Sequence, residues 1–134
     1  MLTRLARLVS VVPAYLVLCS SCELFEASGC DAYATWMLAV NVTDSQTGNP
    51  IAVPFTVAVY SSATGDSVVY VLPADTPKPF QVPEGARAGW AGGRYSVEVR
   101  AAGFQTWRSA EIVIKEKDCG HPITQSVQAT LLPL

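Results

Sequence analysis

The only histidine of the chain, His121, lies two residues after Cys119, and this pair is the first place to look for chemistry. A cysteine and a histidine can form a nucleophile–base pair or supply two metal ligands. A tetrahedral zinc site needs further ligands, and no Cys-x-x-Cys spacing supplies them. No glycine-rich loop opens a helix, so no phosphate cradle is indicated. We therefore predict no catalytic residue, no metal site and no cofactor.

An alternative keeps His121 at the centre of the function. In this alternative the protein is a small secreted hydrolase in which the imidazole works with a nearby carboxylate. It requires His121 to lie in a pocket with Asp or Glu within hydrogen-bonding distance, and not on an open turn. The sequence alone leaves both interpretations of His121 open.

The first 21 residues have the pattern of an export signal. Arg4 and Arg7 form a basic beginning, and an apolar run extends from Leu8 to Leu18. That run is shorter than the ~20 residues that a membrane-spanning helix needs. We expect residues 1–21 to be a signal peptide, with a buried or anchoring helix as the alternative.

The run LCSSC at positions 18–22 resembles the lipobox of bacterial lipoproteins, in which small residues precede a cysteine that becomes acylated. The resemblance implies a lipid anchor on Cys22, with Cys19 as the second choice because Cys19 stands where the family usually has an aliphatic residue. It also implies a place in the bacterial cell envelope. Glu23 follows the acceptor where an Asp would imply inner-membrane retention, which favours the outer membrane or its periplasmic face. Ordinary secretion is the alternative.

The remaining cysteines, Cys30 and Cys119, flank the part of the chain that follows the signal. In an exported protein, two such cysteines more often form a disulfide than a metal or catalytic site. A bridge that closes a loop of roughly 90 residues would stabilise the fold by ~4–5 kcal/mol in the chain-entropy model. Two free thiols are the alternative. We expect residues 22–34 to form a tether that contains Cys30.

Residues 93–104 show strict alternation of apolar and polar side chains between glycines. Successive side chains of a strand point to opposite faces, so one face of this strand is predicted to be dry and the other wet. The apolar set is Tyr95, Val97, Val99 and Ala101, and the polar set is Ser96, Glu98 and Arg100. The rest of the chain is predicted to supply strands that cover the dry face.

Further strands are expected at 35–43, 55–60, 67–72, 80–82, 110–117 and 124–132, separated by turn residues. In the first of these, Trp36 is expected to share one face with Leu38, Val40 and Val42, and Met37 is expected on the other face. The strand at 67–72 is more continuously apolar, so both of its faces are expected to be covered. The sequence predicts an all-β, antiparallel β-sandwich of about seven strands, after an N-terminal signal helix.

Two stretches resemble carboxypeptidase regulatory-like domains. The first is VNVTD at 40–44 with TGNPI at 47–51, and the second is GRYSVEV at 93–99 with AAGF at 101–104. The resemblance covers roughly residues 35–133 and implies a transthyretin-like, prealbumin-type β-sandwich. Such modules are accessory parts of peptidases, receptors or polysaccharide-active proteins, or stand alone as envelope lipoproteins. Residues 73–92 depart from the family with a Pro- and Gly-rich loop, for which the resemblance implies no role.

Charge excludes one class of partner. The formal net charge is −2, and removal of Arg4 and Arg7 with the signal changes it to −4. An acidic chain without a basic patch disfavours nucleic acid. The candidate contact residues are the aromatic side chains Trp90, Phe104 and Trp107, which could stack on a sugar or on an apolar partner surface. The alternative is that they pack in the core or cap it.

These observations predict a non-enzymatic cell-envelope lipoprotein with one carboxypeptidase regulatory-like domain. Its partners would be the membrane, through the lipid, and an envelope protein or polysaccharide. The role would be structural or binding. Pairing of an edge strand with a partner or a second copy is a further possibility.

Overall fold

The structure of the protein is a computed structural model that describes residues 35–134. The predicted signal peptide, the acylation candidates Cys19 and Cys22, and Cys30 in the tether lie outside the described residues. The elements are β1 (Trp36–Asp44), β2 (Phe55–Ser61), β3 (Ser67–Leu72), β4 (Phe80–Pro83), β5 (Gly93–Ala101), β6 (Trp107–Arg108), β7 (Ile112–Ile114), the 3-10 turn η2 (Asp118–Gly120) and β8 (Gln125–Leu131).

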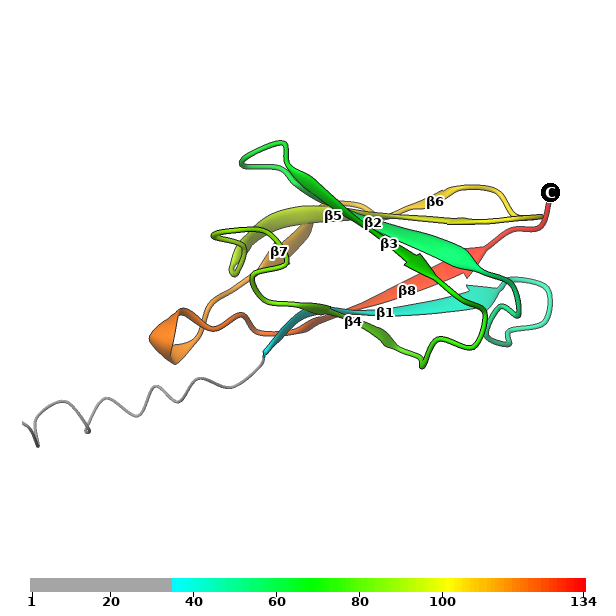
Figure 1. Ribbon diagram of the computed structural model, residues 1–134, viewed down its shortest axis with the longest axis horizontal. Coiled ribbons are helices and arrows are strands. Elements are labelled where there is room, and N and C mark those ends of the chain that lie inside the picture. Colours follow the sequence, from blue (N-terminus) through cyan, green and yellow to red (C-terminus); the bar gives the residue numbers. More distant parts are fainter. Residues whose placement is uncertain (1–34) are drawn as a thin grey trace, which may run out of the picture. The chain divides into compact units, whose positions relative to one another are not determined.

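These strands form two sheets that face each other (Figure 1). One sheet has three strands in the order β4–β1–β8, and the other has five, in the order β3–β2–β5–β6 with β7 also paired to β5. The pairs are antiparallel except for β1 and β8, which run parallel from Leu38 opposite Gln125 to Asp44 opposite Leu131. The predicted all-β sandwich is confirmed.

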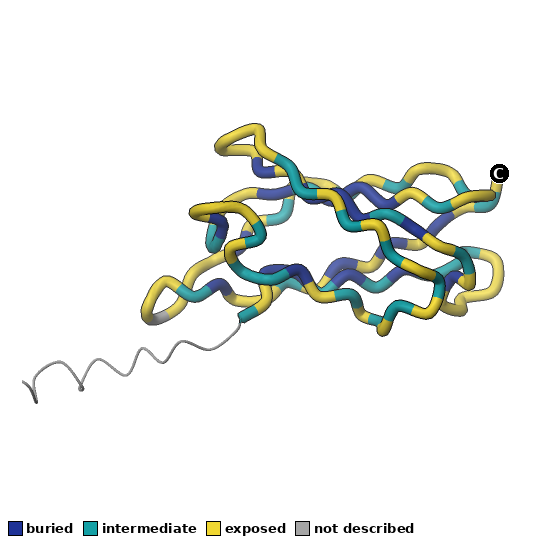
Figure 2. The backbone as a smooth tube through the Cα atoms, viewed as in Figure 1, coloured by how far each residue is buried: buried dark blue, intermediate teal, exposed yellow. Residues whose placement is uncertain are grey.

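The core lies between the two sheets and follows the predicted alternation. On β5, Tyr95, Val97 and Val99 are at most 3% exposed, and they face the apolar side of the other sheet. Figure 2 shows the buried stretches along the inner strands and the exposed ones mainly at the loops. Burial of one such valine or leucine side chain contributes about 1.5–3 kcal/mol, so the interior of this sandwich is its main source of stability. The largest fully buried side chains are Met37, Leu38, Leu131, Val40, Val42, Val57, Val59, Val82, Val97 and Val99.

The beginning of β1 differs from the expectation. The pairing of β1 with β4 is irregular between Trp36 and Leu38. An irregularity of this kind turns neighbouring side chains to the opposite face from the one that simple alternation assigns. Met37 is therefore fully buried like Leu38, whereas Trp36 is 37% exposed, and the prediction that Trp36 shares a face with Leu38 is wrong.

The prediction that both faces of β3 are covered is also wrong. The two sheets face each other (Figure 1), so only the inner face of β3 meets the other sheet. There the Tyr70 ring packs edge-to-face on Phe80 of β4, with 5.0 Å between centroids. On the outer side, Val69 is 58% exposed and Val71 is 79% exposed. Two of the apolar side chains of this strand are thus exposed to solvent.

The strand predicted at 110–117 is shorter, and residues 107–108, outside every predicted strand, form β6. The cause is the hydroxyl of Ser109, which accepts from β5 in the place of a backbone carbonyl. Ser109 N–H donates to the Val97 carbonyl at 2.9 Å, and Ser109 Oγ accepts from Val97 N–H at 2.9 Å. This exchange interrupts regular pairing with β5, so β6 and β7 pair with it as separate strands.

Candidate functional site

His121 lies beside a carboxylate that is far away in the sequence. Its Nδ1 is 3.1 Å from Glu84 Oε2, and the hydroxyl of Thr35 donates a hydrogen bond to the same oxygen. The side chains of His121 and Glu84 are 21% and 28% exposed. We call this group the Thr35–Glu84–His121 cluster. It joins the residue before β1, the residue after β4 and the segment after η2, at one end of the sandwich (Figure 1).

The electrostatics of this cluster favour an ionised carboxylate. Hydrogen bonds from Thr35 and then from His121 hold the pKa of Glu84 below its ordinary value of 4.5. A carboxylate in this position orients the imidazole ring beside it, as in many acid–base pairs. The Thr35 hydroxyl, however, donates to Glu84 and is not directed toward His121. The cluster is thus suited to fastening three segments, and the two surface depressions described below are lined by other residues.

Within residues 35–134, no three side chains of His, Cys, Asp or Glu gather closely enough to hold a metal ion. The same part of the chain has no helix of sufficient length and apolar character to cross a bilayer. Predicted lipidation at Cys22 or Cys19 and the predicted pairing of Cys30 with Cys119 involve residues outside the described range, so both stay predictions.

The structure places the three aromatic candidates against the core. Trp90 is 3% exposed and packs edge-to-face on Tyr95, with 5.3 Å between the ring centroids. Phe104 and Trp107 are partly buried and also pack on the core, and Phe104 bridges to Pro133 near the end of the chain. This burial supports the core-packing alternative for all three side chains, and most strongly for Trp90.

A different group, which we call the Glu98 cluster, occupies the outer face of the five-stranded sheet. Glu98 on β5 accepts hydrogen bonds from Nε of Arg100 at 2.6 Å and from Nε of Arg108 at 2.7 Å. The Glu98 side chain is only 8% exposed, whereas those of Arg100 and Arg108 are 59% and 69% exposed. Arg108 lies opposite Glu98 on β6, and Arg100 lies two residues further along the same face of β5. The two arginines thus cover the carboxylate.

The chemistry of the Glu98 cluster follows from this geometry. Hydrogen bonds from Arg108 and then Arg100 hold the pKa of Glu98 below its ordinary value, although burial acts in the opposite direction. Among the described residues, each guanidinium bonds to the carboxylate through Nε alone. A guanidinium has five N–H donors in a planar fork that matches carboxylate and phosphate geometry. The cluster therefore presents two oriented, solvent-facing donor groups with one net positive charge.

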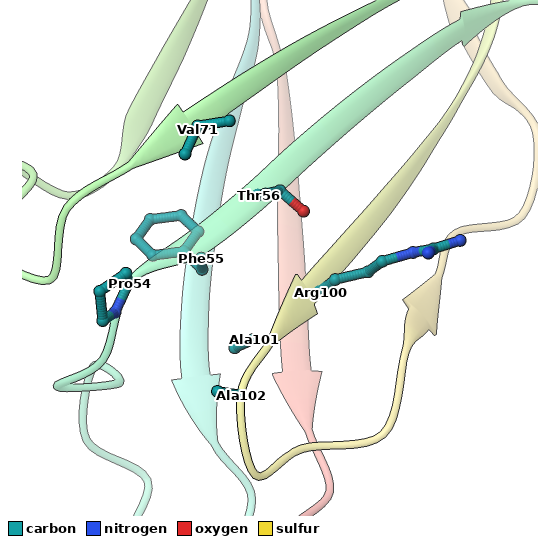
Figure 3. Close-up of a pocket in the computed structure, with 7 residues that line it drawn as sticks. All are labelled: Pro54, Phe55, Thr56, Val71, Arg100, Ala101 and Ala102. Carbon is teal, nitrogen blue, oxygen red and sulfur yellow. The ribbon is translucent and has the colours of Figure 1, made fainter.

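Two open depressions border the Glu98 cluster on the outer face. The first, of about 310 Å³, is lined by Pro54, Phe55, Thr56, Val71, Arg100, Ala101 and Ala102. Figure 3 shows Val71, Thr56 and Arg100 on three neighbouring strands of this face. The second, of about 200 Å³, is lined by Tyr60, Ser96, Val97, Glu98, Arg108 and Ser109. The second thus combines an aromatic ring, hydroxyl groups and a guanidinium.

The sequence alone indicated part of the Glu98 cluster. Glu98 and Arg100 were expected together on the polar face of their strand, and opposite charges at i and i+2 on one strand face are close enough to pair. Arg108 could not be added, because its place opposite Glu98 depends on which segments pair in the sheet. The burial of Glu98 depends on Arg108 as well.

Comparisons with protein-family models, curated proteins and solved structures find no match for this chain. The resemblance to carboxypeptidase regulatory-like domains rests on the residues quoted above and stays a prediction.

Proposed function

We propose that the protein is a non-enzymatic cell-envelope lipoprotein with one carboxypeptidase regulatory-like domain that binds an envelope protein or glycan. The observation that carries the proposal is the Glu98 cluster, with an open depression on each side. An enzyme encloses most of a small substrate, whereas shallow, open surfaces suit contact with a larger partner. Two guanidiniums pre-oriented by a buried carboxylate lose less freedom on binding than free side chains do.

The chemistry of the outer face favours a partner that carries carboxylate or phosphate groups. Arg100 and Arg108 supply planar donors, and Tyr60, 38% exposed beside Arg108, supplies a ring face for stacking. Arg94 lies on the same face but bonds to exposed Glu111 at 3.0 Å, so its charge is already compensated. An acidic envelope glycan or an acidic protein segment fits these groups.

The proposed anchor holds the protein at a membrane surface. We propose that residues 1–21 are removed, that Cys22 is acylated and that residues 22–34 are the tether. Acyl chains contribute about 0.8 kcal/mol for each buried CH₂ group, so a multiply acylated cysteine holds a protein on a membrane without a spanning helix. The proposal here rests on the sequence pattern alone.

The proposed pairing of Cys30 with Cys119 has support from the described residues. The segment after Cys119 lies close to the beginning of β1, because His121 and Thr35 share Glu84, and the Thr124 hydroxyl donates to the Trp36 carbonyl at 2.6 Å. Cys30 precedes Thr35 by five residues, which span up to about 17 Å when extended. A short tether that begins near the segment containing Cys119 is consistent with the proposed pairing.

Intact mass of the protein purified from membranes of a bacterial host tests the anchor and the bridge. We expect loss of residues 1–21, added acyl mass on Cys22, and a gain of about 2 Da on reduction, the mass of two hydrogens on one disulfide. The variant Cys22→Ser should lack the acyl mass and leave the membrane fraction. An unmodified chain with reduced cysteines would reject both assignments.

Binding to isolated envelope glycans and outer-membrane proteins tests the role of the Glu98 cluster. The double variant Arg100→Ser/Arg108→Ser should lose at least about tenfold in affinity, since each charge-assisted contact is worth roughly 1.5–3 kcal/mol. Arg94→Ser is the matched control, because it removes an arginine from the same face outside the cluster. Equal loss in both variants would indicate a general charge effect and reject the site.

A second candidate function is the small hydrolase, and the 3.1 Å contact between His121 and Glu84 is the observation that favours it. It predicts hydrolysis of an activated ester that is lost in His121→Ala and reduced in Glu84→Gln. The lipoprotein proposal predicts that wild type and His121→Ala hydrolyse such an ester equally slowly. This assay separates the two functions directly.

A further inference from the structure

The second depression of the outer face lies where strand β5 changes its partner. Strand β5 pairs with β6 at Glu98 and with β7 at residues 93–95, and Ser109 lies in the chain between β6 and β7. Because Ser109 bonds to both backbone groups of Val97, the regular ladder is interrupted at this point. The hollow there, of about 200 Å³, is smaller than the roughly 300–1,000 Å³ of pockets for drug-sized ligands. It has room for a ligand of one ring.

The side chains around this hollow offer groups of different chemistry. Tyr60 on β2, 38% exposed, presents a ring, and Arg108 on β6 presents a largely exposed guanidinium. Ser96, which lies opposite Tyr60 on β5, and Ser109 contribute hydroxyls. Strand β5 lies between β2 and β6, so the backbones that carry the ring and the guanidinium are two strand spacings apart, roughly 10 Å. A single ring with its substituents fits this span.

The polar groups of the hollow keep hydrogen-bonding capacity that the fold does not use. The Ser109 oxygen accepts from Val97 N–H, and no described residue accepts the hydrogen of its hydroxyl. Within residues 35–134, Arg108 bonds through Nε alone, and the Ser96 hydroxyl has no hydrogen-bond partner. A polar ligand therefore meets several donors that are available to it.

The charge around the hollow suits a carboxylate. Arg100 and Arg108 share Glu98, which leaves one net positive charge. Arg94 on the same face is compensated by Glu111. A carboxylate carries one negative charge, and its planar shape matches the fork of a guanidinium. A phosphate monoester carries about −1.5 to −2 at neutral pH, which is more than this cluster balances.

We propose that this hollow binds one uronic acid residue of an acidic glycan, that is, a pyranose ring with a carboxylate in place of its hydroxymethyl group. The sugar ring lies on Tyr60, the carboxylate accepts from Arg108, and the sugar hydroxyls bond to Ser96 and Ser109. This inference rests on the proposed function, because it names the ligand of the same surface.

A uronic acid uses every group of the hollow, whereas the other acidic ligands do not. An aspartate or glutamate side chain of a protein partner ends in a carboxylate, but it has no ring face for Tyr60 and no hydroxyls for the two serines. A pyranose has C–H groups on its faces, which suit an aromatic ring, and hydroxyls at its rim. A neutral sugar lacks the group that Arg108 is oriented to bind.

Saturation-transfer NMR on the purified full chain tests the ligand. The probes are methyl glucuronide, methyl glucoside, which differs only in lacking the carboxylate, and N-acetylglutamate amide as the acidic peptide analogue. Saturation of the protein's aromatic protons should pass to the ring protons of the glucuronide, with a dissociation constant on the order of 1 mM. The other two probes should bind at least about tenfold more weakly.

Variants locate the site. Tyr60→Ala should abolish the transfer from aromatic protons, and Tyr60→Phe should retain it because the ring face remains. Ser96→Ala should weaken binding several-fold and keep the wild-type melting temperature, so it tests the site even if Tyr60→Ala does not fold. Thr56→Ala is the matched control, because it removes a hydroxyl from the first depression, and it should bind as the wild type does.

The outcomes separate this inference from the proposed function. Equal binding of the three probes, or wild-type affinity in both Tyr60→Ala and Ser96→Ala, would overturn the inference. Polygalacturonate that binds these two variants normally but not Arg100→Ser/Arg108→Ser would overturn it and leave the proposed function standing. If Arg100→Ser/Arg108→Ser binds the polymer and the glucuronide as the wild type does, both are rejected.

Discussion

Glu98 accepts a hydrogen bond from Nε of Arg108 at 2.7 Å across the β5–β6 pair, on a sheet face that otherwise meets solvent. A buried carboxylate is costly unless its charge is compensated by good hydrogen bonds. Here Arg108 and Arg100 provide that compensation and exclude water from the carboxylate. The interaction also fastens β6, a strand of two residues, to the centre of the sheet. One contact therefore supports both the fold and the proposed binding surface.

Replacement of the carboxylate should weaken the fold measurably. Glu98→Gln removes two charge-assisted hydrogen bonds, but the exposed arginines regain water, so we expect a loss of about 1–2 kcal/mol in the free energy of unfolding. Urea unfolding followed by circular dichroism measures this loss. Glu111→Gln is the control, because it removes the exposed pair with Arg94 and should cost no more than about 0.5 kcal/mol. Equal costs would mean that the burial of Glu98 has no energetic consequence.

The two lowered carboxylate pKa values predict a pH dependence of stability. Both Glu98 and Glu84 have a folded-state pKa below the ordinary value of 4.5 to which they return in the unfolded chain. The unfolded state therefore binds more protons at low pH, and stability increases with pH in that range. The stabilisation should be complete above about pH 5 and lost progressively below pH 4.5. Urea midpoints measured from pH 3 to 7 should show this slope, and Glu98→Gln should reduce it.

Trp90 should be a core residue in its energetics as well as in its position. Trp90→Ala should cost about 3–5 kcal/mol, because it removes a side chain that is 3% exposed together with its contact to Tyr95. Trp90→Phe should cost less than half as much, since Nε1 of Trp90 has no hydrogen-bond partner among the described residues. Trp36→Ala, at 37% exposure, is the control and should cost about 1 kcal/mol or less. Thermal and urea unfolding measure all three variants.

Gly103 should tolerate a side chain poorly for a conformational reason. It has a φ of +85° in the turn where Phe104 N–H donates to the Ala101 carbonyl at 3.2 Å. No heavy atom lies within 4 Å of a Cβ built at this position, so the cost of Gly103→Ala is the left-handed backbone alone, about 1 kcal/mol. Gly103→Asn should cost less, because asparagine adopts this conformation more readily. A reversed order of the two variants in urea unfolding would contradict this explanation.

Local pattern was sufficient for most of the strands, although it missed β6. Alternation along residues 93–101 predicted that Tyr95, Val97 and Val99 of β5 face the core. Such patterns succeed because the period of two is a property of each strand by itself. Turn residues and glycines between the apolar runs then indicated an all-β sandwich, which the two sheets confirm.

The candidate sites depended on pairing between distant segments, which no local pattern contains. His121 meets Glu84 across 37 positions of sequence, and Arg108 covers Glu98 only because β6 pairs with β5. The position of β3 at the end of its sheet also depends on pairing between distant segments. Its apolar run predicted a strand that is covered on both faces, but Val69 and Val71 are exposed. The sequence by itself determined where most of the strands form and which of their faces are apolar. The tertiary structure decided which faces are covered, because burial depends on the neighbour that each strand acquires.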